Sequence, residues 1–352
     1  MIFLAAALLA QTPFVAINHK PLPPSKDDFY FVALGDNRPA GAGLPPTGTY
    51  REILKEVAII DPEFVLSTGD LLYGNDDTLD QYKQEEVWMK PLLDTLPCPF
   101  FNVPGNHEVN NNPAFLDEYT KTMGPAFGRF DFGQFRFLAV CTELPAEKPT
   151  VFGAQMDWLK TEMANPKPTF IYEHHPVYNR VTNTEDTATV SNGKELHQLY
   201  LSGGVKAVFE GHDHVYDAQT HDGIMYTIAG GSGAPLDATV TDGGFFNYVI
   251  VHVSGTKIDE SVITPHSLEV VPITDGVAAI ANYAFYDIPV RNMIVFSKTE
   301  PKSVTAGYGT KTGKTKSVDV SLVDVARVRG GFEAQVALMV PHKHATFVKL
   351  GY

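Results

Sequence analysis

Five short polar clusters in the sequence each follow an apolar run of strand length. They contain aspartate, asparagine and histidine, and in chain order they are Gly35-Asp36-Asn37-Arg38, Gly69-Asp70-Leu71-Leu72-Tyr73, Gly105-Asn106-His107-Glu108, Glu173-His174-His175-Pro176 and Gly211-His212-Asp213-His214. Carboxylate and amide oxygens combined with imidazole nitrogens suit zinc, manganese or iron rather than a metal bound by soft thiolates. Since no single cluster holds enough donors for a metal ion, the chemistry requires several clusters to meet at one place.

Taken together, the clusters supply enough donors for two metal ions. The candidate ligands are Asp36, Asp70, Tyr73, Asn106, His174, His212 and His214. Two metal ions about 3.5–4 Å apart hold the attacking and the leaving oxygen of a phosphoryl transfer, and a carboxylate such as Asp70 can bridge them. Metal ions also lower the pKa of a bound water, which supplies a hydroxide nucleophile near neutral pH. The donor set therefore predicts a dinuclear hydrolytic site.

The strands of an α/β domain are the elements that position these clusters. The apolar runs that precede them are Phe29–Leu34, Phe64–Thr68, Phe100–Val103, Thr169–Tyr172 and Val205–Phe209. Apolar spacing predicts helices at Arg51–Ile60, Thr78–Leu96, Gln155–Met163 and Lys194–Tyr200. The alternation of strands and helices indicates a layered α/β domain, in which ligands bind beyond the carboxyl ends of the strands. We therefore expect the clusters to converge on one edge of a sheet.

Two local patterns add detail to this fold. Phe130–Phe132 and Phe135–Phe137 flank Gly133-Gln134 and predict a hairpin, so we expect mixed rather than purely parallel sheets. In the helix predicted after Asp77, Thr78 is expected to be the cap, and Pro91 is expected to kink or split the helix.

The chain is expected to contain four segments. Residues 1–16 include an apolar run, Ile2–Ala10, that is too short to span a membrane and is typical of a secretory signal peptide. Cleavage after Ala10 or Ala16 would export the protein to the periplasm or the medium. Residues 17–27 are Pro-rich and polar and are interpreted as a linker, and 28–271 as the α/β domain. Residues 272–352 are expected to form a small all-β unit, with strands at Asn292–Phe296, Ser317–Val323, Phe332–Val340 and Ala345–Leu350.

Composition excludes several classes of protein. With 352 residues, of which 44% are hydrophobic and 19% charged, the chain is neither disordered nor a coiled coil. A net charge of −14 disfavours nucleic acids and anionic membranes as partners. The two cysteines, Cys98 and Cys141, exclude a four-cysteine zinc site. Both lie in apolar runs and are interpreted as buried thiols, with one internal disulfide as the alternative. No other apolar stretch has membrane-spanning length.

The order of the five clusters, GDNR, GDLLY, GNHE, HHP and GHDH, resembles the five motifs of calcineurin-like metallophosphoesterases. The resemblance covers Phe29 to Ser254. It implies a layered α-β-β-α sandwich with mixed sheets, and a site with two metal ions that hydrolyses phosphoesters.

One departure from the common family pattern indicates a branch of the family. Arg38 stands where most members have a histidine ligand, whereas Tyr73 lies three residues after Asp70, which resembles the Gly-Asp-x-x-Tyr motif of purple acid phosphatases. The resemblance implies that the first metal binds Asp36, Asp70, Tyr73 and His214, and the second binds Asp70, Asn106, His174 and His212. It further implies iron in the first position, paired with zinc, manganese or a second iron. His174 is chosen over His175 because the family's ligand lies two residues before the proline.

Two further residues are candidates for catalysis. By resemblance, His107 lies near the leaving group and would protonate it as a general acid; the alternative is a scaffold role with Glu108 as its orienting partner. Arg38 is expected to bind a phosphate oxygen, or alternatively to neutralise the neighbouring carboxylates. His175 is interpreted as a neighbour of the site, Asn110–Asn112 as a polar loop, and His342 and His344 as surface residues.

The leading hypothesis is a dinuclear metal-dependent phosphatase that hydrolyses small phosphomonoesters with a metal-bound hydroxide, as purple acid phosphatases do. A second hypothesis keeps the same site but assigns it to phosphodiesters, such as nucleotides or phospholipid head groups. A third is a non-catalytic binding protein with a structural metal site. The complete ligand set argues against the third hypothesis. No nucleic acid is expected as a partner beyond a nucleotide substrate.

Overall fold

The computed structural model describes residues 14–39, 41–74, 78–109, 113–146, 149–180, 189–238, 242–265, 277–280, 291–297, 299–309, 315–318, 320–328, 331–338 and 346–351. The chain divides into two compact units. The first comprises the chain up to Arg51 and from Glu63 to Val262, and the second comprises Glu52–Pro62 and the chain from Ile263 onward. The domain boundary predicted after residue 271 lies outside the described residues, as do Asn110–Asn112, His342 and His344.

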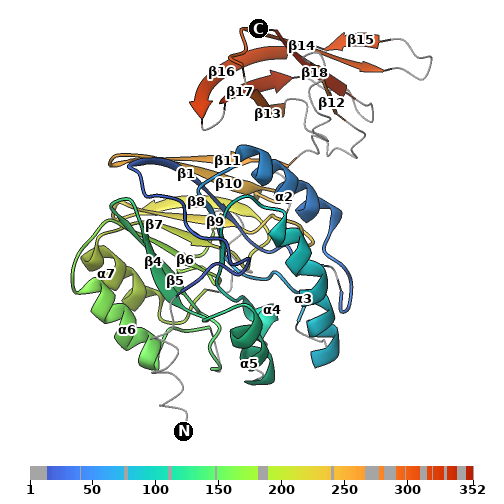
Figure 1. The fold of residues 1–352 in the computed structure, drawn as a ribbon. Helices are drawn as coiled ribbons and strands as arrows, with labels where there is room; N and C mark the ends of the chain where they lie inside the picture. The colour runs from blue at the N-terminus through green and yellow to red at the C-terminus, as the bar shows by residue number, and fades with distance from the viewer. Residues whose placement is uncertain are drawn as a thin grey trace. The chain divides into compact units, whose positions relative to one another are not determined.

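A five-stranded sheet carries the first three clusters (Figure 1). Its strands, in spatial order, are β11 (Lys257–Ile263), β10 (Tyr248–Ser254), β1 (Asp28–Leu34), β2 (Phe64–Ser67) and β3 (Phe100–Asn102). β1, β2 and β3 are parallel, whereas β10 is antiparallel to β1. The sheet is therefore mixed, and its three parallel strands end at the same edge.

A six-stranded sheet carries the other two clusters. Its strands, in spatial order, are β4 (Gly128–Phe132), β5 (Phe135–Val140), β6 (Thr169–Glu173), β7 (Val205–Glu210), β9 (Ile224–Ala229) and β8 (Tyr216–His221). β5, β6, β7 and β9 are parallel, and β4 and β8 are antiparallel to their neighbours. β4 and β5 form the predicted hairpin, with Phe132 opposite Phe135.

Aromatic side chains from the two sheets meet in one core. The ring of Phe31 on β1 lies 5.3 Å from that of Phe170 on β6 and 5.7 Å from that of Phe209 on β7, centroid to centroid. Phe64 on β2 lies 5.0 Å from Phe137 on β5. Because alternate residues of a strand face the same side, strands such as β1, β5 and β10 each contribute a row of apolar side chains to this interface. The first unit is therefore a sandwich of two facing mixed sheets, as expected.

Helices flank the sheets of the first unit. They are α3 (Leu79–Asp94), α4 (Asn106–Val109), α5 (Pro113–Thr122), α6 (Gly153–Met163) and α7 (Gly193–Gly203), whereas most of α2 (Gly48–Ile60) belongs to the second unit. Leu159 of α6 and Leu196 of α7 belong to a second apolar cluster with Ile171 of β6, so α6 and α7 cover the outer face of the six-stranded sheet (Figure 1). Among the described residues, no helix is long and apolar enough to cross a membrane.

Helix α3 confirms one detail of the sequence analysis and excludes one of the two alternatives given for another. Thr78 caps the helix in a capping box with Gln81, as its position predicts. Pro91, however, lies inside one continuous helix and does not split it. Pro91 is exposed, and so is Val87, whose carbonyl loses its helical donor to the proline. Water can hydrogen-bond to that carbonyl, which explains why the helix continues.

The second unit is rich in β-structure, as expected. A four-stranded sheet has the order β12-β18-β14-β15 and a three-stranded sheet has the order β13-β17-β16, and all of their paired strands are antiparallel. The strands are β12 (Val277–Ile280), β13 (Arg291–Ser297), β14 (Ser303–Gly309), β15 (Thr315–Val318), β16 (Val320–Val328), β17 (Gly331–Leu338) and β18 (Thr346–Gly351). β12 and β14 have no counterpart among the strands predicted from the sequence.

The segment before β1 is attached to the first unit. Ala16 is buried in the aromatic core, and the ring of Phe14 stacks on that of Phe101 at 6.1 Å. The side chain of Asn18 donates to the carbonyls of Leu93 and Cys98 at 3.2 and 3.0 Å. A signal-peptide cleavage after Ala16 would therefore remove side chains that pack in this core. Residues 1–13 of the predicted signal peptide lie outside the described residues. Cys98 and Cys141 are buried and free, as interpreted from the sequence.

Candidate metal centre

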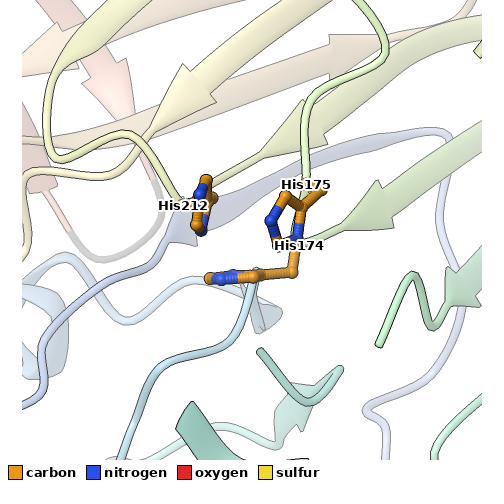
Figure 2. Close-up of side chains that lie close together, drawn as sticks. All are labelled: His174, His175 and His212. Carbon is orange, nitrogen blue, oxygen red and sulfur yellow. The ribbon is translucent and has the colours of Figure 1, made fainter. Parts of the chain in front are cut away.

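The carboxyl ends of five strands bring the polar clusters together. Asp36 follows β1, Asp70 follows β2, Asn106 follows β3, His174 follows β6 and His212 follows β7. The ligand atoms of Asp36, Asp70 and His174 lie within 4.8 Å of one another. The ring nitrogens of His174, His175 and His212 form a second group with the same spacing (Figure 2). The predicted convergence is thus present for residues from both sheets.

Three residues of the site have unusual backbone conformations. Asp36, Asp70 and His212 have positive φ angles of 57°, 55° and 69°, a region that non-glycine residues seldom adopt and that is typical of functional sites. Gly69 has φ 102°, and a Cβ at this position would lie 2.5 Å from the backbone nitrogen of Gly105. Only glycine permits the turn after β2 to approach the turn after β3 this closely.

His174 presents an unprotonated nitrogen to two oxygen acceptors. Its Nδ1 lies 2.8 Å from the carbonyl oxygen of Thr68, and because a carbonyl only accepts, this nitrogen carries the proton. Burial lowers the pKa of His174, so the ring is neutral and its Nε2 holds a lone pair. Nε2 nevertheless faces Oδ1 of Asn106 at 2.8 Å and Oδ1 of Asp70 at 3.4 Å. Acceptors that face one another in this way are typical of the ligands of a shared cation.

His214 repeats this arrangement at Asp36. Its Nδ1 donates to the carbonyl of Pro235, which leaves Nε2 as the lone-pair nitrogen. Nε2 lies 3.7 Å from Oδ1 of Asp36, and burial lowers the pKa of His214. A backbone carbonyl that orients a histidine through its other nitrogen is the usual environment of a metal-binding imidazole. His214 thus lies beside Asp36, whose ligand atoms also group with those of Asp70 and His174.

The buried charges of the site also favour cations. Asp36 and Asp70 are almost fully buried. Burial and the charge of Asp70 raise the pKa of Asp36 well above its ordinary value. Burial also acts to raise the pKa of Asp70, but the protonated forms of His174 and His107, together with Arg38, lower it. Two buried carboxylates beside neutral imidazoles are stable only with added positive charge, and two metal ions would supply it. The donor set therefore fits the metals that the sequence predicts.

Arg38, Tyr73 and His107 lie together beside Asp70. Nε of Arg38 is 3.5 Å from Oδ2 of Asp70, and its guanidinium carbon is 5.7 Å from the ring centroid of Tyr73. His107 donates its Nδ1 proton to the carbonyl of Tyr73, and its Nε2 lies 3.9 Å from Oδ2 of Asp70. Glu85 of α3 holds this turn by accepting the backbone N–H of Tyr73 at 2.6 Å. Ligation by the Tyr73 hydroxyl stays a prediction.

Glu108 links the turns after β2 and β3 through hydrogen bonds to their backbones. Its carboxylate accepts backbone N–H groups from Asp70, Leu72 and Gly105 at 2.9, 2.8 and 2.7 Å. Glu108 therefore holds the backbone, and the orienting partner of His107 is the carbonyl of Tyr73 instead. Burial and the charge of Asp70 raise the pKa of Glu108 to about 8, although the three N–H groups act in the opposite direction.

Glu108→Ala is expected to lower the free energy of unfolding by about 3 kcal/mol, because it leaves buried N–H donors without an acceptor. Urea denaturation measures the loss. The exposed Glu195, paired with Lys160 at 3.2 Å, provides the matched control. Glu195→Ala should cost less than about 1 kcal/mol. Equal effects of the two substitutions would show that Glu108 does not hold the turns.

Metal binding is expected to persist below the ordinary pKa of histidine. Burial is the main cause of the lowered pKa values at His174, His212 and His214, and the ordinary pKa of histidine is about 6.5. A lower pKa keeps an imidazole unprotonated to a lower pH, and only the unprotonated ring binds a metal. Metal analysis after equilibration across the acidic range should therefore place the midpoint of release below pH 6.5. A midpoint above that value would contradict the assigned ligands.

Two residues of the site were not singled out by the sequence analysis. Glu143 follows β5, and its Oε1 is hydrogen-bonded to Nδ1 of His175. Thr142 donates its hydroxyl to the same Oε1 at 2.6 Å. β5 is parallel to β6, so the rule that identified the other clusters applies equally to the polar pair that follows it. The role of Pro235 has no such signal, since its contribution is a backbone carbonyl.

Comparison with known proteins identifies the family. A family model described as calcineurin-like phosphoesterase matches residues 16–216, which is more than half of the chain. The protein therefore belongs to the calcineurin-like phosphoesterase family. A crystal structure of a dimetal phosphatase from Danio rerio superposes with a TM-score of 0.51 at 14% sequence identity, covering 68% of this chain and all of that one. This similarity establishes a shared fold.

Three curated relatives differ in the reaction that they are named for. The serine/threonine-protein phosphatase CPPED1 of Pongo abelii is 26% identical over 191 residues, or 50% of this chain and 60% of that protein. A probable cyclic nucleotide phosphodiesterase of Rhodococcus erythropolis is 23% identical over 223 residues, or 62% of this chain and 72% of that protein. Tartrate-resistant acid phosphatase type 5 of Rattus norvegicus is 26% identical over 252 residues, or 60% of this chain and 74% of that protein. The matched segment spans only three fifths of the length of the CPPED1 protein.

Proposed function

We propose that the protein is a metal-dependent phosphatase that hydrolyses small phosphomonoesters at a dinuclear site, in the manner of purple acid phosphatases. The observation that carries the proposal is the pair of lone-pair nitrogens, Nε2 of His174 and Nε2 of His214, that face buried oxygen ligands. Asp36, Asp70, Tyr73 and His214 would hold one metal ion, and Asp70, Asn106, His174 and His212 the other. When bound, the metals supply Lewis acidity and an activated water.

The remaining residues of the site have distinct tasks in this reaction. The Arg38 guanidinium, now beside Asp70, would bind the phosphoryl oxygens and offset the repulsion between the substrate and an acidic protein. His107 is fixed through Nδ1, so its Nε2 would carry the proton that the leaving oxygen receives. Two bound metal ions and the Arg38 guanidinium would together bind three unesterified phosphoryl oxygens. A phosphomonoester has three such oxygens and a diester has two, so this arrangement favours monoesters.

A phosphodiesterase with the same site is the second candidate. It is supported by the similarity to the probable cyclic nucleotide phosphodiesterase of Rhodococcus erythropolis. The test compares kcat/KM for an aryl phosphate monoester and for the matching diester, using the full chain loaded with iron, zinc or manganese. A monoester-to-diester ratio well above one supports the phosphatase. A ratio well below one rejects it in favour of the phosphodiesterase.

A visible colour tests the assignment of Tyr73. If its hydroxyl binds ferric iron, the iron-loaded protein should absorb in the visible range through charge transfer from tyrosinate to iron. Tyr73→Phe should abolish this absorption and leave the protein folded. Tyr178→Phe is the control, because Tyr178 stacks on His221 at 3.7 Å and belongs to neither metal group. A colourless but active iron protein would contradict the assignment.

A further inference from the structure

His175 is a third buried imidazole at the metal centre. A ring nitrogen of His175 lies within 4.8 Å of ring nitrogens of His174 and His212, and the three rings gather around one space in Figure 2. Its ring stacks on that of His212, with centroids 3.7 Å apart and an interplanar angle of 27°. His212 and His174 are both assigned to the second metal ion, so His175 borders the position of that ion.

Glu143 determines which nitrogen of His175 is available. Oε1 of Glu143 is hydrogen-bonded to Nδ1 of His175 and accepts the hydroxyl proton of Thr142 at 2.6 Å. Thr142 Oγ1 in turn accepts the backbone N–H of His175 at 3.1 Å. A carboxylate oxygen accepts, so Nδ1 of His175 donates to Glu143 and Nε2 is the ring nitrogen left for a ligand.

This arrangement resembles the support of an established metal ligand. Histidines that bind metals usually donate their other ring N–H to a carboxylate or a backbone carbonyl, which fixes the ring and raises its basicity. His174 has such a partner in the carbonyl of Thr68, and His175 has one in Glu143. His174 and His175, adjacent residues at the end of β6, thus each have a hydrogen-bond acceptor at Nδ1, and each contributes a ring nitrogen to the same cluster.

We propose that His175 is an additional ligand of the second metal ion, which it binds through Nε2 and alongside His174 and His212. The proposal rests on the dinuclear site of the proposed function and adds a ligand from the end of β6. Imidazole suits zinc and iron, whereas manganese and magnesium prefer oxygen ligands. A metal position with three imidazoles should therefore select zinc or iron.

A count of bound imidazoles tests the proposal without any substitution. The full chain is loaded with two equivalents of Co²⁺, and the hyperfine-shifted ring N–H protons that exchange with solvent are recorded by proton NMR. One such signal is expected from each of His174, His175, His212 and His214. Only three signals would overturn the proposal, whether or not the protein hydrolyses phosphoesters.

Two variants identify the additional signal. His175→Phe keeps a flat ring against His212 but removes the donor, so it should delete one N–H signal and weaken Zn²⁺ binding at one position by about 10–100-fold. Glu143→Gln should weaken the same position through loss of the carboxylate. His252→Phe is the matched control, because His252 stacks on Tyr30 at 4.2 Å and is partly exposed. Unchanged signals and affinity in His175→Phe would show that the ring only packs.

The inference and the proposed function can fail separately. Four imidazole signals in a protein that hydrolyses neither monoesters nor diesters would support His175 as a ligand and reject the phosphatase. Three signals in an active phosphatase would do the reverse. A chain that binds fewer than two equivalents of Co²⁺ would overturn both.

Discussion

Asp70→Asn is expected to lower phosphoester hydrolysis by about a thousandfold or more, because Asp70 is the carboxylate assigned to both metal ions. Its Oδ1 lies 3.4 Å from Nε2 of His174 and accepts the backbone N–H of His107 at 3.1 Å. An amide keeps one of these acceptor positions but loses the negative charge that would bridge two cations. The variant should also retain less than two equivalents of metal, as metal analysis would measure.

An exposed aspartate gives the matched control for this substitution. Asp259 on β11 pairs with Lys257 at 2.7 Å, and its side chain is 47% exposed. Asp259→Asn should leave activity and metal content unchanged, since an exposed pair contributes less than about 1 kcal/mol to stability. Full hydrolytic activity in Asp70→Asn would refute the bridging role.

His107→Gln is expected to lower kcat by about 10²–10⁴-fold for alkyl phosphates, whose leaving oxygen must be protonated. The loss should shrink for aryl phosphates with good leaving groups, because these depart without a proton. The dependence on the leaving group separates proton donation from a purely structural role, which would lower all rates equally. The reason lies in the geometry: His107 is fixed through Nδ1 by the carbonyl of Tyr73, and its Nε2 points to the side of Asp70.

Steady-state rates for a series of phosphomonoesters with different leaving groups measure this dependence. His197→Gln is a suitable control, since His197 is also buried and hydrogen-bonded, to Tyr226 at 2.9 Å and Asp222 at 3.0 Å, and belongs to neither metal group. This control should show the same relative rates as the unmodified protein. A uniform loss across the series in His107→Gln would contradict a general acid.

The convergence of the clusters was predictable from the sequence for a physical reason. Parallel strands end at the same edge of a sheet, so residues that follow them meet even when they are far apart in the chain. Asp36 and His212 illustrate this: they are separated by 176 positions, yet the backbone N–H of His212 donates to Oδ1 of Asp36 at 3.0 Å. Glycine in four of the five clusters added a signal, because only a residue without a side chain permits this approach at Gly69.

The parts of the site that the sequence did not predict depend on backbone atoms and on tertiary contacts. The carbonyls of Thr68, Tyr73 and Pro235 orient three histidines, but every residue has a carbonyl, so their identity carries no information. The surroundings of His174 and His175 differ because their rings are oriented differently at the end of β6, and ring orientation cannot be deduced from the sequence. Strand β14 escaped prediction because Ser303–Gly309 contains two glycines and lacks a clear apolar alternation.

A metal titration of the metal-free full chain tests the central claim most directly. Hydrolysis of an aryl phosphate monoester is followed as zinc, manganese or iron is added, while bound metal is measured in parallel. A dinuclear phosphatase predicts no hydrolysis without metal and a rate that rises until two equivalents are bound. Hydrolysis that is independent of metal, or that saturates at one equivalent, would contradict this account. Two bound equivalents without hydrolysis of a monoester or a diester would instead identify a binding protein with a structural metal site.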